Sequence, residues 1–66
     1  MIGILIIAHA PLASALRECA LHVFPDCAGG VLALDVLPYE APEASLAKAR
    51  EAITSLATPE VLLLSD

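Results

Sequence analysis

The stretch IGILIIAHAPLASAL, residues 2–16, decides the fold of this chain. Its first seven residues form an uninterrupted apolar run rich in isoleucine, which is typical of a strand buried on both faces. Pro11 then suits the start of a helix, because the N–H that proline lacks would have no partner there. We therefore expect a central parallel strand over 2–8, a turn at His9 and a helix of about three turns. Apolar residues at helical spacing predict its buried stripe, namely Leu12, Leu16, Cys19 and Val23.

The remaining sequence repeats this alternation of strand and helix. The segment FPDCAGG, residues 24–30, breaks the first helix, and residues 31–37 form a second apolar run. A loop rich in proline leads into a second helix that begins near Pro42. Residues 61–64 form a third apolar run, which predicts the last strand. The buried stripe expected on the second helix consists of Leu46, Ala49, Ile53 and Leu56.

Strands that alternate with helices through short links predict a parallel sheet with right-handed crossovers. The expected fold class is α/β, a three-layer, doubly wound parallel sheet with a β-α-β-α-β order and strand order 2-1-3. Two helices cannot cover both faces of three strands, so we expect the domain to be incomplete. Sheet surface that these two helices leave uncovered accounts for a hydrophobic content of 59%. This content exceeds the roughly 45–50% of ordinary soluble domains.

The composition argues against several classes of protein. No run of about 20 apolar residues could span a bilayer, and no basic segment opens the chain as in a signal peptide. We therefore expect a soluble, cytoplasmic chain without direct membrane insertion. The net charge of −5 gives nucleic acid no basic surface to bind. Cys19 and Cys27 form neither a CxxC pair nor a disulfide framework, and we expect no metal and no cofactor.

Two reactive side chains are expected at one edge of this sheet. In open parallel sheets, ligands bind beyond the carboxyl ends of the strands, where the strand order reverses. With order 2-1-3, His9 follows the first strand and Asp66 follows the neighbouring third strand. A carboxylate that accepts the proton of one ring nitrogen fixes the tautomer and leaves the lone pair of the other nitrogen facing solvent. The pair therefore predicts a phosphoryl-accepting catalytic histidine, His9, oriented by Asp66.

The helix that follows His9 adds to this site. An anion at a helix N-terminus is stabilised by unpaired backbone N–H groups and by the helix dipole. We expect the backbone of Ala10 and Leu12 to bind the phosphoryl group at this point. The same dipole favours the neutral, nucleophilic form of the imidazole.

These segments resemble a known family, the mannose-family enzyme IIA component of the bacterial phosphoenolpyruvate-dependent sugar phosphotransferase system. IGILIIAHAPLASAL (2–16) is similar to the family's first strand, histidine turn and helix. VLALDVLPYEAPEASL (31–46) resembles its second strand, loop and second helix, and VLLLSD (61–66) resembles the strand that delivers its aspartate. A complete family domain is about twice as long, so residues 1–66 resemble the N-terminal half of a single IIA-like domain.

The resemblance implies a cytoplasmic phosphocarrier, a phosphotransferase component that works through a phosphohistidine intermediate. The phosphocarrier protein HPr would phosphorylate the histidine matching His9, and an enzyme IIB partner would receive the group for sugar uptake or a regulatory phosphorelay. The aspartate matching Asp66 would bind that imidazole. Full-length members of the family are implied to form homodimers.

Two alternatives remain open. The IIA-like domain of dihydroxyacetone-kinase phosphotransferase subunits would look the same over this stretch. A non-catalytic fragment or interaction module that retains the fold is also compatible, because Ala8 and Ala10 stand where the family usually has threonine and glycine.

Four further side chains are given structural interpretations. We expect His22 on the surface, Cys19 as a small core residue, and Leu21 opposite the buried face of the first helix. Asp35, near the end of the second strand, is expected to cap a helix or satisfy a loop.

Overall fold

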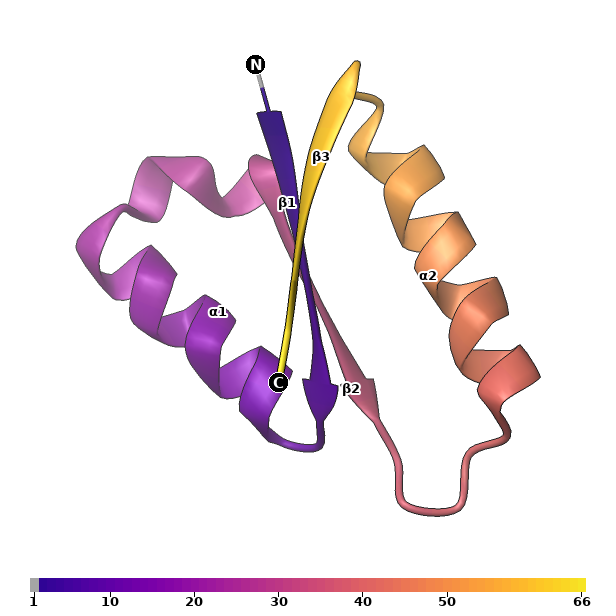
Figure 1. Ribbon diagram of the computed structural model, residues 1–66. Coiled ribbons are helices and arrows are strands. Elements are labelled where there is room, and N and C mark those ends of the chain that lie inside the picture. The colour runs from indigo at the N-terminus through magenta and orange to yellow at the C-terminus, as the bar shows by residue number, and fades with distance from the viewer. Residues whose placement is uncertain (1) are drawn as a thin grey trace.

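The structure is a computed structural model that describes residues 2–66. Three parallel strands form one sheet in the order β2-β1-β3, and helices connect them (Figure 1). The elements in chain order are β1 (Ile2–His9), α1 (Leu12–Val23), the 3-10 helix η1 (Pro25–Gly30), β2 (Val31–Val36), α2 (Pro42–Leu56) and β3 (Glu60–Ser65). The predicted α/β class and strand order are confirmed.

His9 is the last residue of β1 and not the first residue after it. It pairs with Val36 of β2, and Ala10 extends the same ladder by donating its N–H to the Val36 carbonyl oxygen at 2.9 Å. The chain then enters α1 through Pro11, which is the N-cap residue and has a cis peptide bond to Ala10. The sheet therefore fixes the backbone of His9 at the point where the chain turns.

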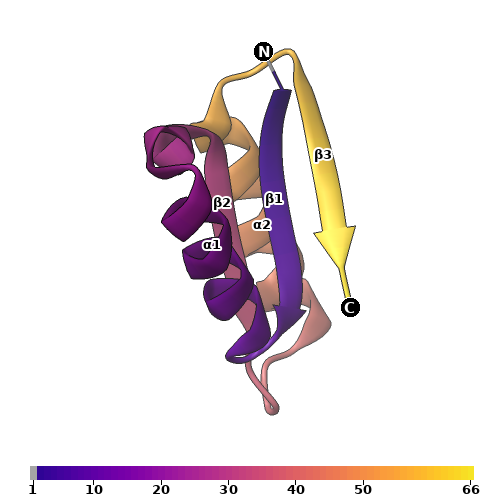
Figure 2. The same cartoon turned by 90° about the vertical axis from the view of Figure 1, so that its left-hand side faces the viewer.

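The two helices lie on opposite faces of the sheet (Figure 2). On the α1 face, Ala13 of the helix packs against Ile6 and Ala8 of β1 and Val31 of β2. Ala13 has no exposed surface, so α1 approaches the sheet closely through its smallest side chain.

On the α2 face, Leu56 lies against Gly3 of β1. A Cβ atom at position 3 would stand 2.7 Å from Oγ1 of Thr58 and 3.2 Å from a methyl group of Leu56. Glycine thus allows the end of α2 to approach the central strand. Leu5, two residues further along β1, is completely buried, and burial of one leucine contributes about 1.5–3 kcal/mol.

The side of α1 that faces the sheet is not the side predicted from the spacing of its leucines. The sheet meets Ala13 together with the half-buried Arg17 and Leu21. The expected position of Leu21, opposite the buried face of the helix, is therefore wrong. The expected buried stripe and the core position of Cys19 are also wrong, because four exposed residues form that stripe: Leu12, Leu16, Cys19 and Val23.

Polar contacts explain this rotation of α1. Arg17 donates from Nε to the carbonyl oxygen of Val31 at 2.7 Å and from Nη2 to that of Ala28 at 3.1 Å. Ser14 donates to the carboxylate of Asp35 on β2. Because these bonds hold α1 over β1 and β2, the leucine stripe lies about a third of a turn away from the side that faces the sheet.

The prediction for α2 is half right. Leu56 is buried and Ala49 is half-buried, whereas Leu46 and Ile53 remain 53% and 44% exposed. These two leave apolar surface along one flank of the helix.

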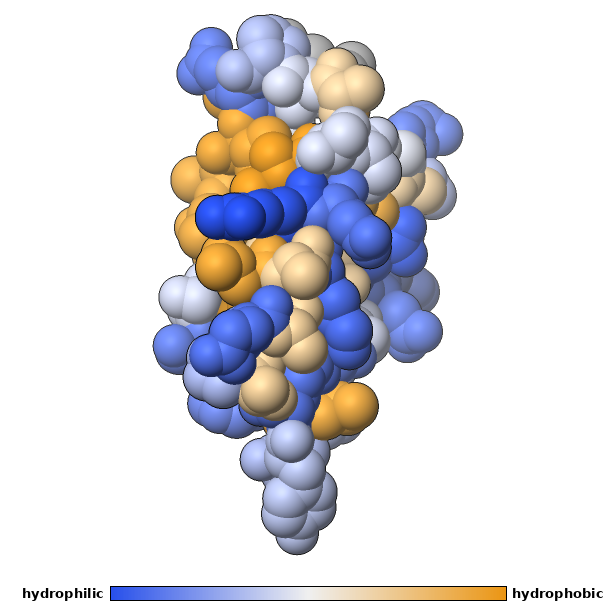
Figure 3. Space-filling view, turned by 90° about the vertical axis from the view of Figure 1, so that its right-hand side faces the viewer, coloured by the Kyte–Doolittle hydropathy of each residue, from blue (hydrophilic) through white to orange (hydrophobic). Residues whose placement is uncertain are grey.

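Strand β3 is the least covered part of the sheet. Both helices pack mainly on β1 and β2, and β3 lies beside them at the sheet's edge (Figure 2). Leu62, Leu63 and Leu64 are 50%, 54% and 45% exposed. Hydrophobic side chains gather on the side of the molecule where β3 lies (Figure 3). The expectation that two helices leave part of the sheet uncovered is confirmed.

Candidate functional site

The structure brings His9 and Asp66 into direct contact, although 57 positions separate them. Parallel pairing places the end of β3 beside the end of β1, with Ser65 opposite Ile7. Nδ1 of His9 then lies 2.8 Å from Oδ2 of Asp66. The same carboxylate oxygen accepts the backbone N–H of His9 at 3.2 Å. Asp66 therefore binds both the backbone and the ring of one residue.

This contact determines which ring nitrogen of His9 carries the proton and which carries the lone pair. An ionised carboxylate only accepts hydrogen bonds, so the neutral imidazole carries its proton on Nδ1 and donates it to Asp66. The lone pair is then on Nε2. The His9 side chain is 78% exposed and that of Asp66 is 34% exposed, so Nε2 is open to an incoming group.

The charge of Asp66 supports the same assignment. The His9 ring, and after it the His9 amide, donate to the carboxylate and lower the pKa of Asp66 below its ordinary value of 3.8. Asp66 is therefore ionised at neutral pH and available as an acceptor for Nδ1–H.

A second carboxylate occupies the start of α1. Asp35 of β2 accepts the backbone N–H of Ser14 at 3.0 Å and the hydroxyl of the same residue. These bonds, with a smaller contribution from the Ala13 amide, lower the pKa of Asp35 below 3.8. Pro11 offers no side-chain cap, so Asp35 caps the helix from another strand. The capping role expected for Asp35 is confirmed.

The amides after His9 differ in their availability. Those of Ala10 and Ser14 donate to Val36 and Asp35. Among residues 2–66, the amide of Leu12 has no acceptor within the chain. At the start of α1, the Leu12 N–H is therefore a backbone donor without a partner among the described residues. Ala10 lies in the same turn, but its N–H belongs to the sheet ladder.

Glu40 fixes the loop at the same edge of the sheet. It accepts a hydrogen bond from Ser45 Oγ at 2.9 Å and one from Lys48 Nζ at 3.1 Å. Both contacts lower the pKa of Glu40, and the Ser45 hydroxyl has the larger effect. Ser45 and Lys48 are three residues apart on α2, so the sequence places them on the same face of the helix. That spacing is the sequence signal for their shared contact with Glu40. Glu40 thus joins the loop after β2 to the first turns of α2.

Other candidate residues lie away from this edge. His22 is exposed near the end of α1, as expected. Cys19 and Cys27 are free thiols. No group of three metal-ligating side chains occurs in the part of the chain that the structure describes.

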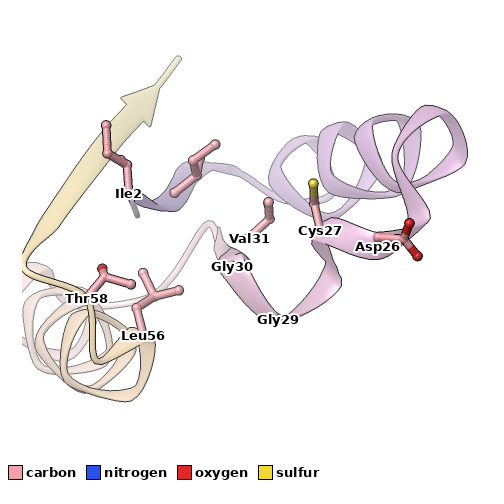
Figure 4. A pocket seen from close by; sticks show the side chains of 9 residues that line it. Ile2, Asp26, Cys27, Gly29, Gly30, Val31, Leu56 and Thr58 are labelled. Atoms are coloured by element: carbon pink, nitrogen blue, oxygen red, sulfur yellow. The ribbon is translucent and has the colours of Figure 1, made fainter.

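A hollow of about 360 Å³ lies at the opposite end of the sheet from His9 (Figure 4). It is lined by Ile2, Ile4, Asp26, Cys27, Gly29, Gly30, Val31, Leu56 and Thr58. It therefore has no part in the His9 site.

Comparison with known proteins identifies the family of this chain. No helix within residues 2–66 is long and apolar enough to cross a membrane. Neither the curated proteins nor the solved structures gave a match. The family model described as the PTS system fructose IIA component, EIIA-man, matches residues 3–66. The chain therefore belongs to the EIIA-man family, the IIA phosphocarrier components of the phosphotransferase system that transports sugars.

Proposed function

We propose that this chain accepts a phosphoryl group on Nε2 of His9 and passes it on, acting as a phosphotransferase component through a phosphohistidine. The observation that carries the proposal is the 2.8 Å contact between Nδ1 of His9 and Oδ2 of Asp66. It leaves the lone pair of Nε2 directed away from the carboxylate, on a side chain that is 78% exposed. A nucleophile oriented by a second group in this way is typical of covalent catalysis.

The chemical step needs no proton from solvent. The lone pair of Nε2 attacks phosphorus while the bond between phosphorus and the donor breaks. The ring then holds positive charge, which the ionised Asp66 stabilises through Nδ1–H. The Leu12 amide would donate to a phosphoryl oxygen at the helix N-terminus. Ala10 would line the same turn without a side chain large enough to obstruct it.

The proposed donor is the phosphocarrier protein HPr and the proposed acceptor is an enzyme IIB. A protein donor must bring its phosphorus to contact distance of Nε2, about 3–3.5 Å, and so must rest on the surface around His9. Leu12 and Leu16, on the first turns of α1, are 41% and 45% exposed. They provide apolar surface on the helix that follows His9, which such a partner could cover.

Phosphoryl incorporation from radiolabelled phosphoenolpyruvate, with enzyme I and HPr, tests this proposal. We expect a label that is labile in acid and stable in base, as a phosphohistidine is. His9→Ala should abolish it, whereas His22→Ala, which removes an exposed histidine far along α1, should keep it. Asp66→Asn should slow incorporation by at least about tenfold, because the amide no longer selects the Nδ1–H tautomer.

Chase with an enzyme IIB tests the second transfer. Loss of label from this chain and its appearance on the IIB protein support the carrier function. Label that persists in His9→Ala, or no incorporation in a folded wild-type chain, would contradict the proposal and favour a non-catalytic interaction module.

A further inference from the structure

The loop between β2 and α2 carries a tyrosine on a turn that the chain holds in place. The Glu40 N–H donates to the carbonyl oxygen of Leu37 at 3.1 Å, which closes a four-residue β-turn with Pro38 and Tyr39 at its centre. Proline at the second position of such a turn has its φ angle already set. The backbone of Tyr39 therefore has little freedom to move.

Glu40 joins this turn to α2, while Tyr39 itself touches nothing. The Glu40 carboxylate accepts hydrogen bonds from Ser45 and Lys48, and its side chain is 6% exposed. Tyr39, the residue before it, is 100% exposed. The turn thus presents a complete aromatic side chain to solvent from a fixed backbone.

Tyr39 lies at the same edge of the sheet as His9. β2 ends at Val36, which pairs with His9, and the loop after β2 projects beyond this edge (Figure 1). Tyr39 follows Val36 by three residues, which span at most about 11 Å, and paired strands lie about 4.8 Å apart. The Cα atoms of Tyr39 and His9 are therefore within about 16 Å of each other.

A protein that delivers a phosphoryl group to His9 would cover this distance. An interface of standard size buries about 800 Å² of each partner, the area of a circular patch with a radius of about 16 Å. Burial of one tyrosine removes about 150–250 Å² from water, which is about a fifth or more of that area. Tyrosine is also among the residue types that carry most of the binding energy in interfaces.

The charges at this edge indicate the kind of surface that would bind it. Asp35 near the end of β2, Asp66 after β3 and Glu43 at the start of α2 are all acidic. Lys48, on the second turn of α2, is paired with Glu40 at 3.1 Å. A protein that binds around His9 is therefore expected to present basic side chains.

We propose that Tyr39 is the anchor residue through which this chain binds its phosphoryl-donor protein, with the ring held in an apolar pocket that basic side chains surround on the donor. The inference rests on the proposed function of His9, which requires a donor at this edge. Tyr39 serves recognition and not the chemical step. Because the turn is already formed, docking costs little ordering of its backbone.

Initial rates of phosphoryl transfer from phosphorylated HPr, measured against HPr concentration, test the proposal. Tyr39→Ala should raise KM at least about tenfold with kcat nearly unchanged, because the lost contact is the same in the bound state and in the transition state. Tyr39→Phe should keep KM within about threefold of the wild type, since the ring remains. Phe24→Ala is the matched control: Phe24 is a 63% exposed aromatic residue at the far end of α1, and its loss should leave KM unchanged.

A small phosphoryl donor separates docking from chemistry. Phosphoramidate reaches His9 without a protein surface, so the wild type and Tyr39→Ala should be labelled by it at the same rate. Their Tm values should also agree, because Tyr39 packs against nothing in the fold. An increase in sodium chloride from about 0.1 M to about 1 M shortens the Debye length from about 10 Å to about 3 Å. KM for HPr should therefore rise in both proteins.

Three results would overturn the proposal: a KM for HPr that Tyr39→Ala leaves unchanged, an equal rise in Phe24→Ala, and slower labelling of Tyr39→Ala by phosphoramidate. A KM that does not rise with salt would overturn the basic donor surface. Failure of the proposed function has a different signature, since His9 of the folded wild type would then take label from neither donor.

Discussion

Gly3→Ala tests whether close packing between β1 and the link from α2 to β3 stabilises this fold. The added Cβ would stand 2.7 Å from Oγ1 of Thr58 and 3.2 and 3.3 Å from two atoms of Leu56. Thr58 cannot move freely, because its hydroxyl donates to the carbonyl oxygen of Glu60 at 2.9 Å. Overpacking costs about 1–3 kcal/mol and a lost hydrogen bond about 1 kcal/mol. The less flexible unfolded chain offsets about 0.4–1 kcal/mol of this.

The net expectation is a loss of about 2 kcal/mol in the free energy of unfolding. Urea unfolding followed by circular dichroism measures it, and Tm should fall by about 8–16 °C. Gly29→Ala is the control, since a Cβ there would meet nothing within 4 Å. Thr58→Ala should restore part of the stability of Gly3→Ala, with a coupling energy of about 1 kcal/mol. Equal stability of Gly3→Ala and Gly29→Ala, or strict additivity with Thr58→Ala, would refute this account of the packing.

Three further variants test separate features of the fold. Leu5→Ala should lower the free energy of unfolding by about 2–5 kcal/mol, because Leu5 is fully buried. Leu46 is exposed, so Leu46→Ala should change that free energy by less than about 0.5 kcal/mol. Equal effects of the two variants in urea unfolding would contradict the burial of Leu5. The pKa of Asp35 is lowered in the folded state by Ser14, so its stabilisation is complete above its unfolded pKa and is lost as pH falls through the folded pKa. As pH falls below about 4, the free energy of unfolding of Asp35→Asn should therefore decrease less steeply than that of the wild type. The same pH dependence in both proteins would contradict the capping of α1 by Asp35. Ala57 ends α2 in the left-handed region with φ 51°, so Ala57→Gly should raise stability by about 0.5–1 kcal/mol, and a lower Tm would contradict that strain.

The order of the strands could be predicted because it depends on strong signals. An isoleucine-rich run such as residues 2–8 suits only a strand covered on both faces, and alternation with helices leaves few topologies. Those topologies place the ends of the first and third strands side by side. The meeting of His9 and Asp66, 57 positions apart, follows from that placement without any knowledge of side-chain contacts.

The rotation of α1 could not be predicted from hydrophobic spacing. Leu12 and Leu16 form a regular apolar stripe, yet the sheet meets the smaller Ala13. Specific polar bonds from Arg17 to backbone carbonyls, and from Ser14 to Asp35, decide which side faces inward. Periodicity assumes that the largest apolar side chains face the core, and here part of the apolar surface remains outside.

The tautomer of His9 is the most direct test of the proposed site. Long-range ¹H–¹⁵N NMR at a pH where the ring is neutral should show the proton on Nδ1, as the 2.8 Å contact with Asp66 requires. After incubation with phosphoenolpyruvate, enzyme I and HPr, the same spectrum should show phosphorus attached to Nε2. A proton on Nε2 in the free protein, or a phosphoryl group on Nδ1, would contradict the assignment of Asp66 as the residue that orients the nucleophile.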